Sequence, residues 1–321
     1  MSLDFPNSIV AIVALAVLSS AACGQAPSAG AGEGAASGEW PSRTPDGQPD
    51  MQGLWASDTG RASLNMEPLD YLRSIGMPRR QGPGPGGGTR LGPPPAANRG
   101  SGPARQRGTL LLDPSDHILP YHPWAKERRD AVMKDYLHPT PEQIDPQTRG
   151  WPNGVPRANY YSSHDGGVGG PIQILQPPGH VVFIYETHHE FRIVPLDGRP
   201  HVGQDIKLWM GDSRGRWEGN TLVIDVTNNN ASTRFNVVGD FHSDGMRVTE
   251  RWTFVDRDTI DYKATIDDQK VYTKPWTIGV THTRSFPGNE IFEYAAVEGD
   301  RGVQEAEEIL RSRTVEDQGV L

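Results

Sequence analysis

From residue 171 onward, the chain alternates short hydrophobic runs with turn-forming residues. Runs rich in Val, Ile, Thr and aromatic residues fall at 172–176, 181–186, 191–196, 221–227, 246–256, 259–267, 276–286 and 292–297. Gly, Pro, Asn and Asp separate the runs, which is typical of strands joined by turns. Because the connections are too short for crossover helices, neighbouring strands should pair antiparallel. A meander of about eight strands predicts a mainly β fold, either a closed barrel or a strongly curved sheet.

Helices are predicted on both sides of these strands. Residues 124–137 follow Pro123, which suits the first turn of a helix, and Pro139 and Pro141 stop the run. A second, short helix is expected at 305–313. The sequence therefore predicts one helix on the N-terminal side of the strands and a short one near the C-terminus.

Glycine and proline, 37 and 28 of the 321 residues, gather in two stretches outside the predicted strands. Residues 23–48 have the composition of a flexible tether. Residues 77–107 carry six Arg and no acidic residue, and we expect a disordered insertion, either a solvated loop or a basic arm for anionic lipid or polysaccharide. Residues 49–321 then form a single β-rich domain around this insertion, long enough to bury its own core.

The N-terminus has the pattern of an export signal. Residues 1–22 contain an apolar run that ends in small residues, as in a signal peptide, and the run is too short for a membrane span. The Cys23-Gly24 step resembles the lipobox of bacterial lipoproteins, which implies a lipid anchor on Cys23. The protein is then expected in the cell envelope as a periplasmic or outer-membrane lipoprotein. Cleavage after Ala22 without lipidation would instead make it a secreted protein.

A longer resemblance lies in the segment W-M-G-D-S-R-G-R-W-E-G-N-T-L-V-I-D at 209–225 and in Y-T-K-P-W at 272–276. These segments resemble a large family of exported, mostly uncharacterised bacterial proteins with the pattern W-x-G-x-S-x-G-x-W-E-G-D-T-L-V-V-D. The resemblance implies export and a shared fold, and it implies no settled activity. Gly53-Leu-Trp55 also resembles the G-x-W of the first lipocalin strand, which favours a lipocalin-like barrel.

Strand phase identifies the first candidate site. In 246–256, Glu250 falls on the same face as Trp252 and other apolar residues, because alternate strand residues face opposite sides. The following turn should pair Trp252 with Tyr262, and in 276–286 His282 and Arg284 share the inward face. Two interpretations stay open: a Glu250–Arg284 ion pair that joins neighbouring strands, or a pocket in which Glu250 binds a polar ligand or acts as a base.

Histidines and tryptophans give further candidates. His188 and Glu190, with His201 or His242 from later loops, could supply imidazole and carboxylate ligands to iron or zinc, although polar hairpin tips are often only solvated. Trp209, beside a glycine turn, could be a platform for an aromatic or sugar ligand. The G-x-S-x-G pattern at 211–215 leads into a strand and not into a helix, so it lacks the context of a hydrolase nucleophile elbow.

Together these patterns favour an exported, lipid-anchored β-barrel that binds a small, partly apolar ligand through Glu250, His282 and Arg284, with Trp252, Tyr262 and Trp209 beside it. The first alternative is an enzyme, a hydratase, isomerase or hydrolase, that uses Glu250 with His282 or His242 for acid–base chemistry. The second is an envelope structural protein without a ligand. No cofactor is predicted, and the net charge of −9 argues against nucleic acid as a partner.

Overall fold

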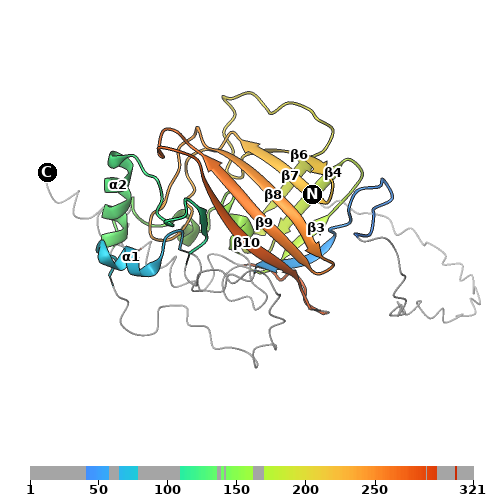
Figure 1. The fold of residues 1–321 in the computed structure, drawn as a ribbon, viewed down its shortest axis with the longest axis horizontal. Helices are drawn as coiled ribbons and strands as arrows, with labels where there is room; N and C mark the ends of the chain where they lie inside the picture. The colour runs from blue at the N-terminus through green and yellow to red at the C-terminus, as the bar shows by residue number, and fades with distance from the viewer. Residues whose placement is uncertain are drawn as a thin grey trace, which may run out of the picture. The chain divides into compact units, whose positions relative to one another are not determined.

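The computed structural model describes residues 41–57, 65–78, 109–135, 139–140, 142–161, 170–286, 288–294 and 308. The fold is mainly β (Figure 1). Its strands are β1 (Gly53–Ser57), β2 (Leu111–Asp113), β3 (Ile172–Leu175), β4 (His180–Tyr185), β5 (Phe191–Pro195), β6 (Asp212–Glu218), β7 (Thr221–Thr227), β8 (Arg247–Asp256), β9 (Thr259–Asp267) and β10 (Trp276–Arg284). The α-helices of the described residues are α1 (Leu69–Ser74), α2 (Pro123–Lys134) and α3 (Arg157–Tyr160), and two short 3₁₀ helices are η2 (Pro146–Arg149) and η3 (Thr187–His189).

These strands form one ten-stranded antiparallel sheet in the order β5-β4-β3-β1-β10-β9-β8-β7-β6, with β2 beside β10. Consecutive strands are neighbours along most of this order, as short connections require. The sheet curls until its two ends, β5 and β6, come into contact. The prediction of a mainly β, lipocalin-like antiparallel barrel is therefore confirmed.

The contact between β5 and β6 depends on a residue without a side chain. A β-carbon on Gly215 would lie 2.7 Å from Val194 Cγ1 and 2.8 Å from Leu196 Cδ2, closer than real β-carbons approach. On the same seam, Arg192 Nε donates a hydrogen bond to Ser213 Oγ at 2.8 Å. The barrel is thus nearly closed by side chains packed against a glycine backbone.

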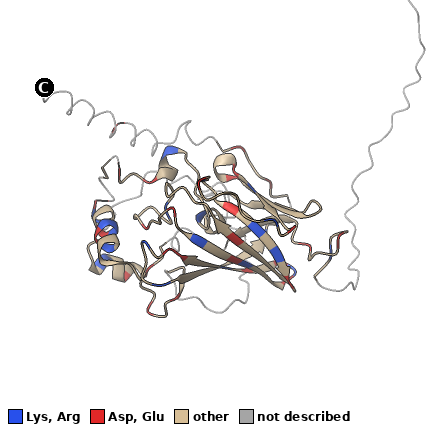
Figure 2. Cartoon of the chain, turned by 90° about the horizontal axis from the view of Figure 1, so that it is seen from above, with Lys and Arg blue, Asp and Glu red and all other residues tan. Residues whose placement is uncertain are grey.

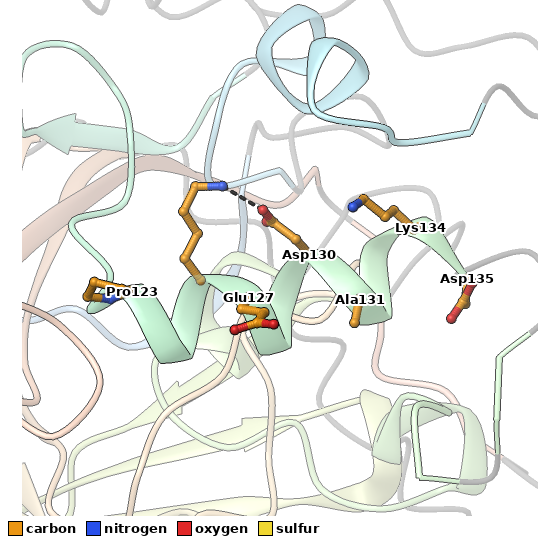
Figure 3. Close-up of a pocket in the computed structure, with 7 residues that line it drawn as sticks. Pro123, Glu127, Asp130, Ala131, Lys134 and Asp135 are labelled. Carbon is orange, nitrogen blue, oxygen red and sulfur yellow. Dashed lines mark hydrogen bonds and ion pairs between the residues drawn. The ribbon is translucent and has the colours of Figure 1, made fainter.

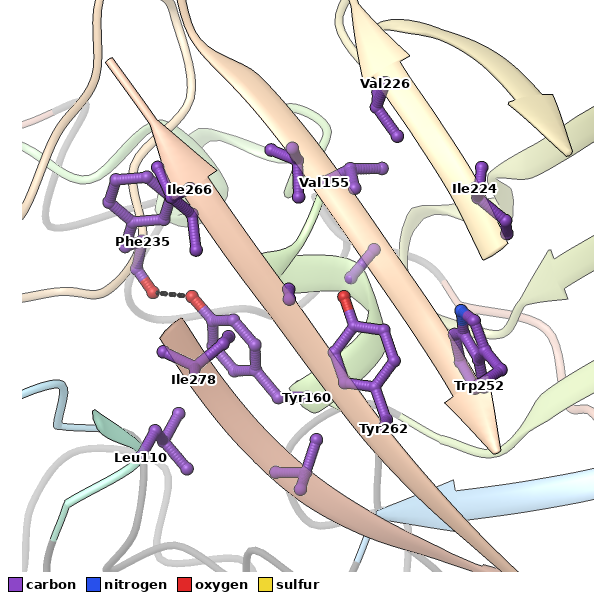
Figure 4. Close-up of a cluster of buried hydrophobic side chains, with 14 of the residues drawn as sticks. Leu110, Val155, Tyr160, Ile224, Val226, Phe235, Trp252, Tyr262, Ile266 and Ile278 are labelled. Atoms are coloured by element: carbon purple, nitrogen blue, oxygen red, sulfur yellow. Dashed lines mark hydrogen bonds between the residues drawn. The ribbon is translucent and has the colours of Figure 1, made fainter. Parts of the chain in front are cut away.

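Strand alternation places the predicted residues inside the barrel. Glu250 lies opposite Ala264, and Trp252 lies opposite Tyr262, as the turn between β8 and β9 predicted. Along β8, buried and exposed residues alternate over most of the strand. Figure 4 shows Trp252 of β8 and Tyr262 of β9 within the hydrophobic core, together with Ile224 of β7 and Ile266 of β9. The interior at this level is filled by side chains.

Several elements differ from the sequence prediction. Seven of the predicted runs coincide with strands of the barrel, but residues 292–294 are not in a strand, and 295–297 lie outside the described residues. Strands β2 and β6 were not predicted, whereas β1 begins at Gly53, where the G-x-W resemblance places a first strand. In β6, the buried positions are taken by polar or small residues such as Ser213 and Gly215, so the strand has no hydrophobic alternation to detect.

The helix predicted at 124–137 is α2, which ends at Lys134. It packs on α1 through a small apolar cluster of Leu72, Met133 and Val238. Of the helix predicted at 305–313, Glu308 alone is described, in helical conformation. None of the helices in the described part of the chain has the length and apolarity to cross a bilayer.

The N-terminal boundary differs slightly from the prediction. Residues 41–48, assigned above to the tether, form a turn in which Thr44 is buried and its amide donates to the Gln48 carbonyl at 2.9 Å. The ordered part described here therefore includes residues before 49. The predicted signal peptide, Cys23, the predicted tether up to residue 40 and residues 79–107 of the Arg-rich segment lie outside the described residues.

Candidate functional site

Glu250 lies inside the barrel, fully shielded from solvent. Its Oε1 accepts hydrogen bonds from Tyr262 Oη at 2.7 Å and from Asn159 Nδ2, and its Oε2 accepts one from Arg192 Nη2. We call Glu250, Arg192, Asn159, Tyr262 and Tyr185 the barrel centre. The carboxylate therefore has a donor on each oxygen and a cation beside it, as a buried charge requires.

The short helix α3 supplies the amide of the barrel centre. All of its residues are buried. Asn159 Oδ1 accepts a hydrogen bond from Tyr185 Oη at 2.8 Å, and the Asn159 carbonyl lies 2.9 Å from His282 Nε2. Asn159 thus connects Glu250 to β4 and β10, and α3 closes this side of the polar network.

The predicted Glu250–Arg284 ion pair is wrong. Arg284 lies at the end of β10, where its guanidinium stacks 4.2 Å over the Trp55 ring and Nε donates to Asp258 Oδ1 at 3.2 Å. Arg192, from strand β5, forms the ion pair with Glu250 that was predicted for Arg284. Arg284 follows the inward phase of β10 but is too close to the rim to share the barrel centre with Glu250.

The barrel centre has the properties of a structural element. Trp252 packs on Tyr262 and His282 with ring centroids 4.6 and 4.8 Å apart, and all three side chains are buried. Burial, reinforced by the charge of Glu250, raises the pKa of Tyr262 well above its usual value, so its hydroxyl stays protonated and donates. Burial opposes the charge of Arg192, but Glu250 outweighs it and raises the pKa of the guanidinium. The buried Arg192–Glu250 ion pair, packed among core side chains, favours a scaffold role for these residues, although Arg192 Nη1 has no hydrogen-bond partner among the described residues.

The metal-ligand candidates are not assembled into one site. His188 and Glu190 lie at the β4–β5 turn, whereas His201 bridges Asp212 and Asp225 at 2.7 and 3.0 Å. His242 lies elsewhere, in a loop before β8. In the described ranges, no group of three or more His, Cys, Asp or Glu side chains is placed to hold a metal ion.

The β4–β5 turn nevertheless holds two groups with altered acidity. Burial lowers the pKa of His188 to about 4, with the charge of Arg157 acting in the same direction. Burial raises the pKa of Glu190 to about 8, opposed by a backbone hydrogen bond from Asn153. Both side chains are therefore mainly neutral near pH 7.

Two surface hollows of the described part of the chain are considered as binding sites. One, of about 660 Å³, runs along α2 and is lined by residues of this helix and its C-terminal cap (Figure 3). Its charges are partly paired within the helix, as in the 2.5 Å contact of Lys126 Nζ with Asp130 Oδ2. A hollow along the face of one helix offers no convergent groups to a ligand.

The other hollow, of about 510 Å³, is bounded by α2, residues 142–151 and the loops 231–234 and 241–244. We call it the arginine cleft; its aromatic and arginine walls are Trp124, Trp151, Phe241, Arg128, Arg149 and Arg234. Trp209 does not line it, but packs edge to face on Trp151 with ring centroids 5.2 Å apart. Since the lining comes from segments far apart in the chain, no local motif indicated it.

His242 is the one sequence-predicted site residue that lines the arginine cleft. Its Nδ1 lies 2.9 Å from the Ser243 carbonyl, so Nδ1 carries the proton and Nε2 accepts from Thr233 Oγ1 at 2.7 Å. Burial lowers the pKa of His242, which favours this neutral form. The arrangement places a neutral imidazole against a hydroxyl in the wall of the cleft.

Fold and site define a class: a nearly closed antiparallel β-barrel with a filled interior around a buried ion pair and a separate surface cleft. No family model matches the chain, and neither a curated protein nor a solved structure is significantly similar to it. The resemblance of the 209–225 segment to a family of exported proteins stays a prediction.

Proposed function

We propose that this protein binds a small, partly apolar ligand in the arginine cleft, and that the barrel is the scaffold that holds this cleft. The observation that carries the proposal is the wall of exposed aromatic rings: Trp124 and Trp151 are 51% and 42% exposed at a hollow of about 510 Å³. Exposed tryptophans beside a concave surface offer an apolar ligand a stacking surface that the filled barrel centre does not.

The experiment uses two naphthalene probes of the same size, the anion 2-naphthoate and the neutral 2-naphthamide. Isothermal titration of the full-length chain should detect at least one of them, and Trp151→Ala should weaken that binding by about tenfold or more. Phe191→Ala removes an even more exposed ring, 66% exposed on β5 and outside the cleft, and should leave binding unchanged. Absence of binding by both of these probes and by 2-naphthyl phosphate, or equal loss in both variants, would refute the assignment.

The export address is part of the same proposal. The apolar run of 1–22 and the lipobox-like Cys23 support an envelope lipoprotein whose ligand site faces the periplasm or the cell exterior. Labelled palmitate should be incorporated by the wild-type chain in a bacterial host and not by Cys23→Ser. Labelling that persists in the variant would exclude Cys23 as the anchor.

A second candidate function is acid–base catalysis in the same cleft. It is favoured by the 2.7 Å contact between His242 Nε2 and Thr233 Oγ1, because a neutral imidazole there can take a proton from a hydroxyl or a water. Hydrolysis of 4-nitrophenyl acetate by the wild type, lost in His242→Gln with the fold intact by circular dichroism, would support an enzyme. Equal hydrolysis by both proteins would exclude His242 as the base and keep the binding function.

A further inference from the structure

The charges of the arginine cleft are unbalanced toward positive. Three arginines line it against two acidic residues, Glu142 and Asp244. Asp244 is already engaged, with Lys270 Nζ at 2.7 Å and Lys207 Nζ at 3.5 Å. The chain as a whole is acidic, with a net charge of −9, and Figure 2 shows basic and acidic residues interleaved over the domain. The arginine cleft therefore concentrates positive charge on the surface of an acidic protein.

Arg234 shows this surplus most clearly. Its Nη1 and Nη2 donate to the backbone carbonyls of Gln143 and Glu142, at 2.5 and 2.7 Å. These carbonyls fix the guanidinium in place but carry no full negative charge. Across the described ranges, no carboxylate lies within ion-pair distance of Arg234 or of Arg128.

Three arginines buried in the core of this fold are each paired with a carboxylate. Arg129 is paired with Glu67, Arg157 with Asp145 and Arg192 with Glu250. Each of these buried guanidinium groups has a carboxylate at hydrogen-bond distance, as desolvated charges generally require. Arg234 is half-buried and departs from that rule within the same protein.

Electrostatics around Arg234 agree with the geometry. Burial is the main reason that the pKa of Arg234 lies below its usual value; Asp145 opposes this effect, and the charges of Arg128, Arg157 and Arg149 add to it. Both oxygens of Asp145 are already held by Arg157, at 2.9 and 2.7 Å. A negative charge delivered to the cleft would therefore offset both the cost of desolvating Arg234 and the mutual repulsion of these cations.

The remaining arginines are positioned by the aromatic wall. Arg128 Cζ lies 4.6 Å from the centroid of Phe241, and Arg149 Cζ lies 5.6 Å from the centroid of Trp151. Stacking of this kind holds guanidinium planes at fixed places next to apolar rings. A ligand that fits the cleft thus meets cations and ring faces side by side.

We infer that the ligand of the arginine cleft is a small organic anion that joins an oxyanion group, carboxylate or phosphate, to an apolar ring. The oxyanion lies against Arg234 and Arg128, and the ring lies against Trp124 and Trp151. This inference rests on the proposed binding function and adds the chemical class of the ligand. Guanidinium groups suit both oxyanions, because each accepts paired N–H donors.

The experiment compares 2-naphthoate and 2-naphthyl phosphate with the neutral 2-naphthamide, by isothermal titration of the full-length chain at low and high KCl. At least one anion should bind about tenfold or more tightly than the amide, as expected for a charge-assisted contact, and KCl should weaken that preference. Arg234→Met and Arg128→Met should each reduce it. Arg251→Met is the matched control, because Arg251 lies on β8 and is already paired with Glu218 at 3.0 Å.

The outcomes separate the two levels of the proposal. Equal binding of the amide and both anions, lost in Trp151→Ala, would overturn the anionic class and keep the cleft as a binding site. Absence of binding by all three probes would remove the binding function itself. A preference for anions that survives in both Arg234→Met and Arg128→Met would also overturn the inference. Because Arg128 is exposed, Arg128→Met should fold and tests the inference even where Arg234→Met does not fold.

Discussion

Substitution of Glu250 by Gln should destabilise the fold strongly. Glu250 is the carboxylate partner of buried Arg192, and it accepts from Tyr262 and Asn159 as well. The neutral amide would leave the Arg192 charge desolvated and uncompensated, and the amide nitrogen would face groups that donate. Removing one partner of a buried ion pair costs about 3–5 kcal/mol. For a domain of this size, that corresponds to a fall in Tm of roughly 6–20 °C.

Urea unfolding of the full-length chain, followed by tryptophan fluorescence, measures this effect. Glu218→Gln is the control, because Glu218 is a partly exposed strand residue paired with Arg251 and Arg216, and its loss should change stability much less. The double variant Arg192→Met with Glu250→Gln should recover part of the loss, since it removes the stranded charge together with its partner.

Two results would refute this reasoning. One is a Glu250→Gln variant within about 1 kcal/mol of the wild type, which would mean that the ion pair is not needed to compensate a buried charge. The other is a folded Glu250→Gln variant that no longer binds a naphthalene probe that the wild type binds. That outcome would return Glu250 to the ligand site and would contradict the separation of barrel centre and arginine cleft.

Three further predictions concern pH and packing. Burial raises the pKa of Glu67 to about 7, so the stability that this group contributes is fully present below its unfolded pKa of 4.5 and is lost as the pH rises through about 7. Glu67→Gln should flatten this decline in urea midpoints, and an unchanged slope would contradict the prediction. Burial lowers the pKa of His188 to about 4, so the stability that this group contributes above pH 6.5 is lost as the pH falls through about 4. His188→Asn should reduce this loss of stability at acid pH, and an equal loss in the variant would count against the lowered pKa of His188. Gly154 has φ +70°, and a β-carbon there would lie 2.6 Å from Thr233 Oγ1, so Gly154→Ala should lower the free energy of unfolding in urea by about 1–3 kcal/mol. Gly179→Ala, at φ +72° in open space, should cost less, and equal costs would exclude the steric contact.

The inward residues of the long strands could be predicted because strand periodicity is strict. Glu250, Trp252 and His282 follow from the phase of β8 and β10 alone, and the β8–β9 turn fixes the pairing of Trp252 with Tyr262. What periodicity does not supply is the partner that reaches Glu250 from across the barrel. That partner depends on how the sheet curls and closes.

Arg192 shows why the partner was missed. In β5 the hydrophobic phase favours Phe191 and Ile193 as the inward residues, yet these are 66% and 51% exposed, and Arg192 is buried. The charge of Glu250 reverses the preference, because a buried carboxylate needs a cation more than the strand needs two more apolar contacts. The sequence signal was present: a buried acidic residue with no cation on the inward face of its own hairpin predicts one from another strand.

The arginine cleft was invisible to sequence patterns for a different reason. Trp124, Trp151 and Arg234 come from a helix, a turn segment and a loop, which meet only after the barrel has formed. No spacing rule connects residues separated by so many intervening elements. His242 was found as a candidate, but as a metal ligand or catalytic base of the barrel, and its contact with Thr233 could be known only from the fold.

Charge compensation explains both the barrel centre and the arginine cleft. In the barrel centre, Arg192 and Glu250 neutralise each other among buried side chains, so the fold itself supplies the counter-charge. In the arginine cleft, Arg234 is held by backbone carbonyls and is opposed by neighbouring cations, so the described chain leaves the interaction incomplete. An arginine that is fixed in position, partly desolvated and without a carboxylate is a poor stabiliser of the fold. Its placement is better explained by a negative group that comes from outside the chain, next to rings that can hold the apolar part of the same molecule.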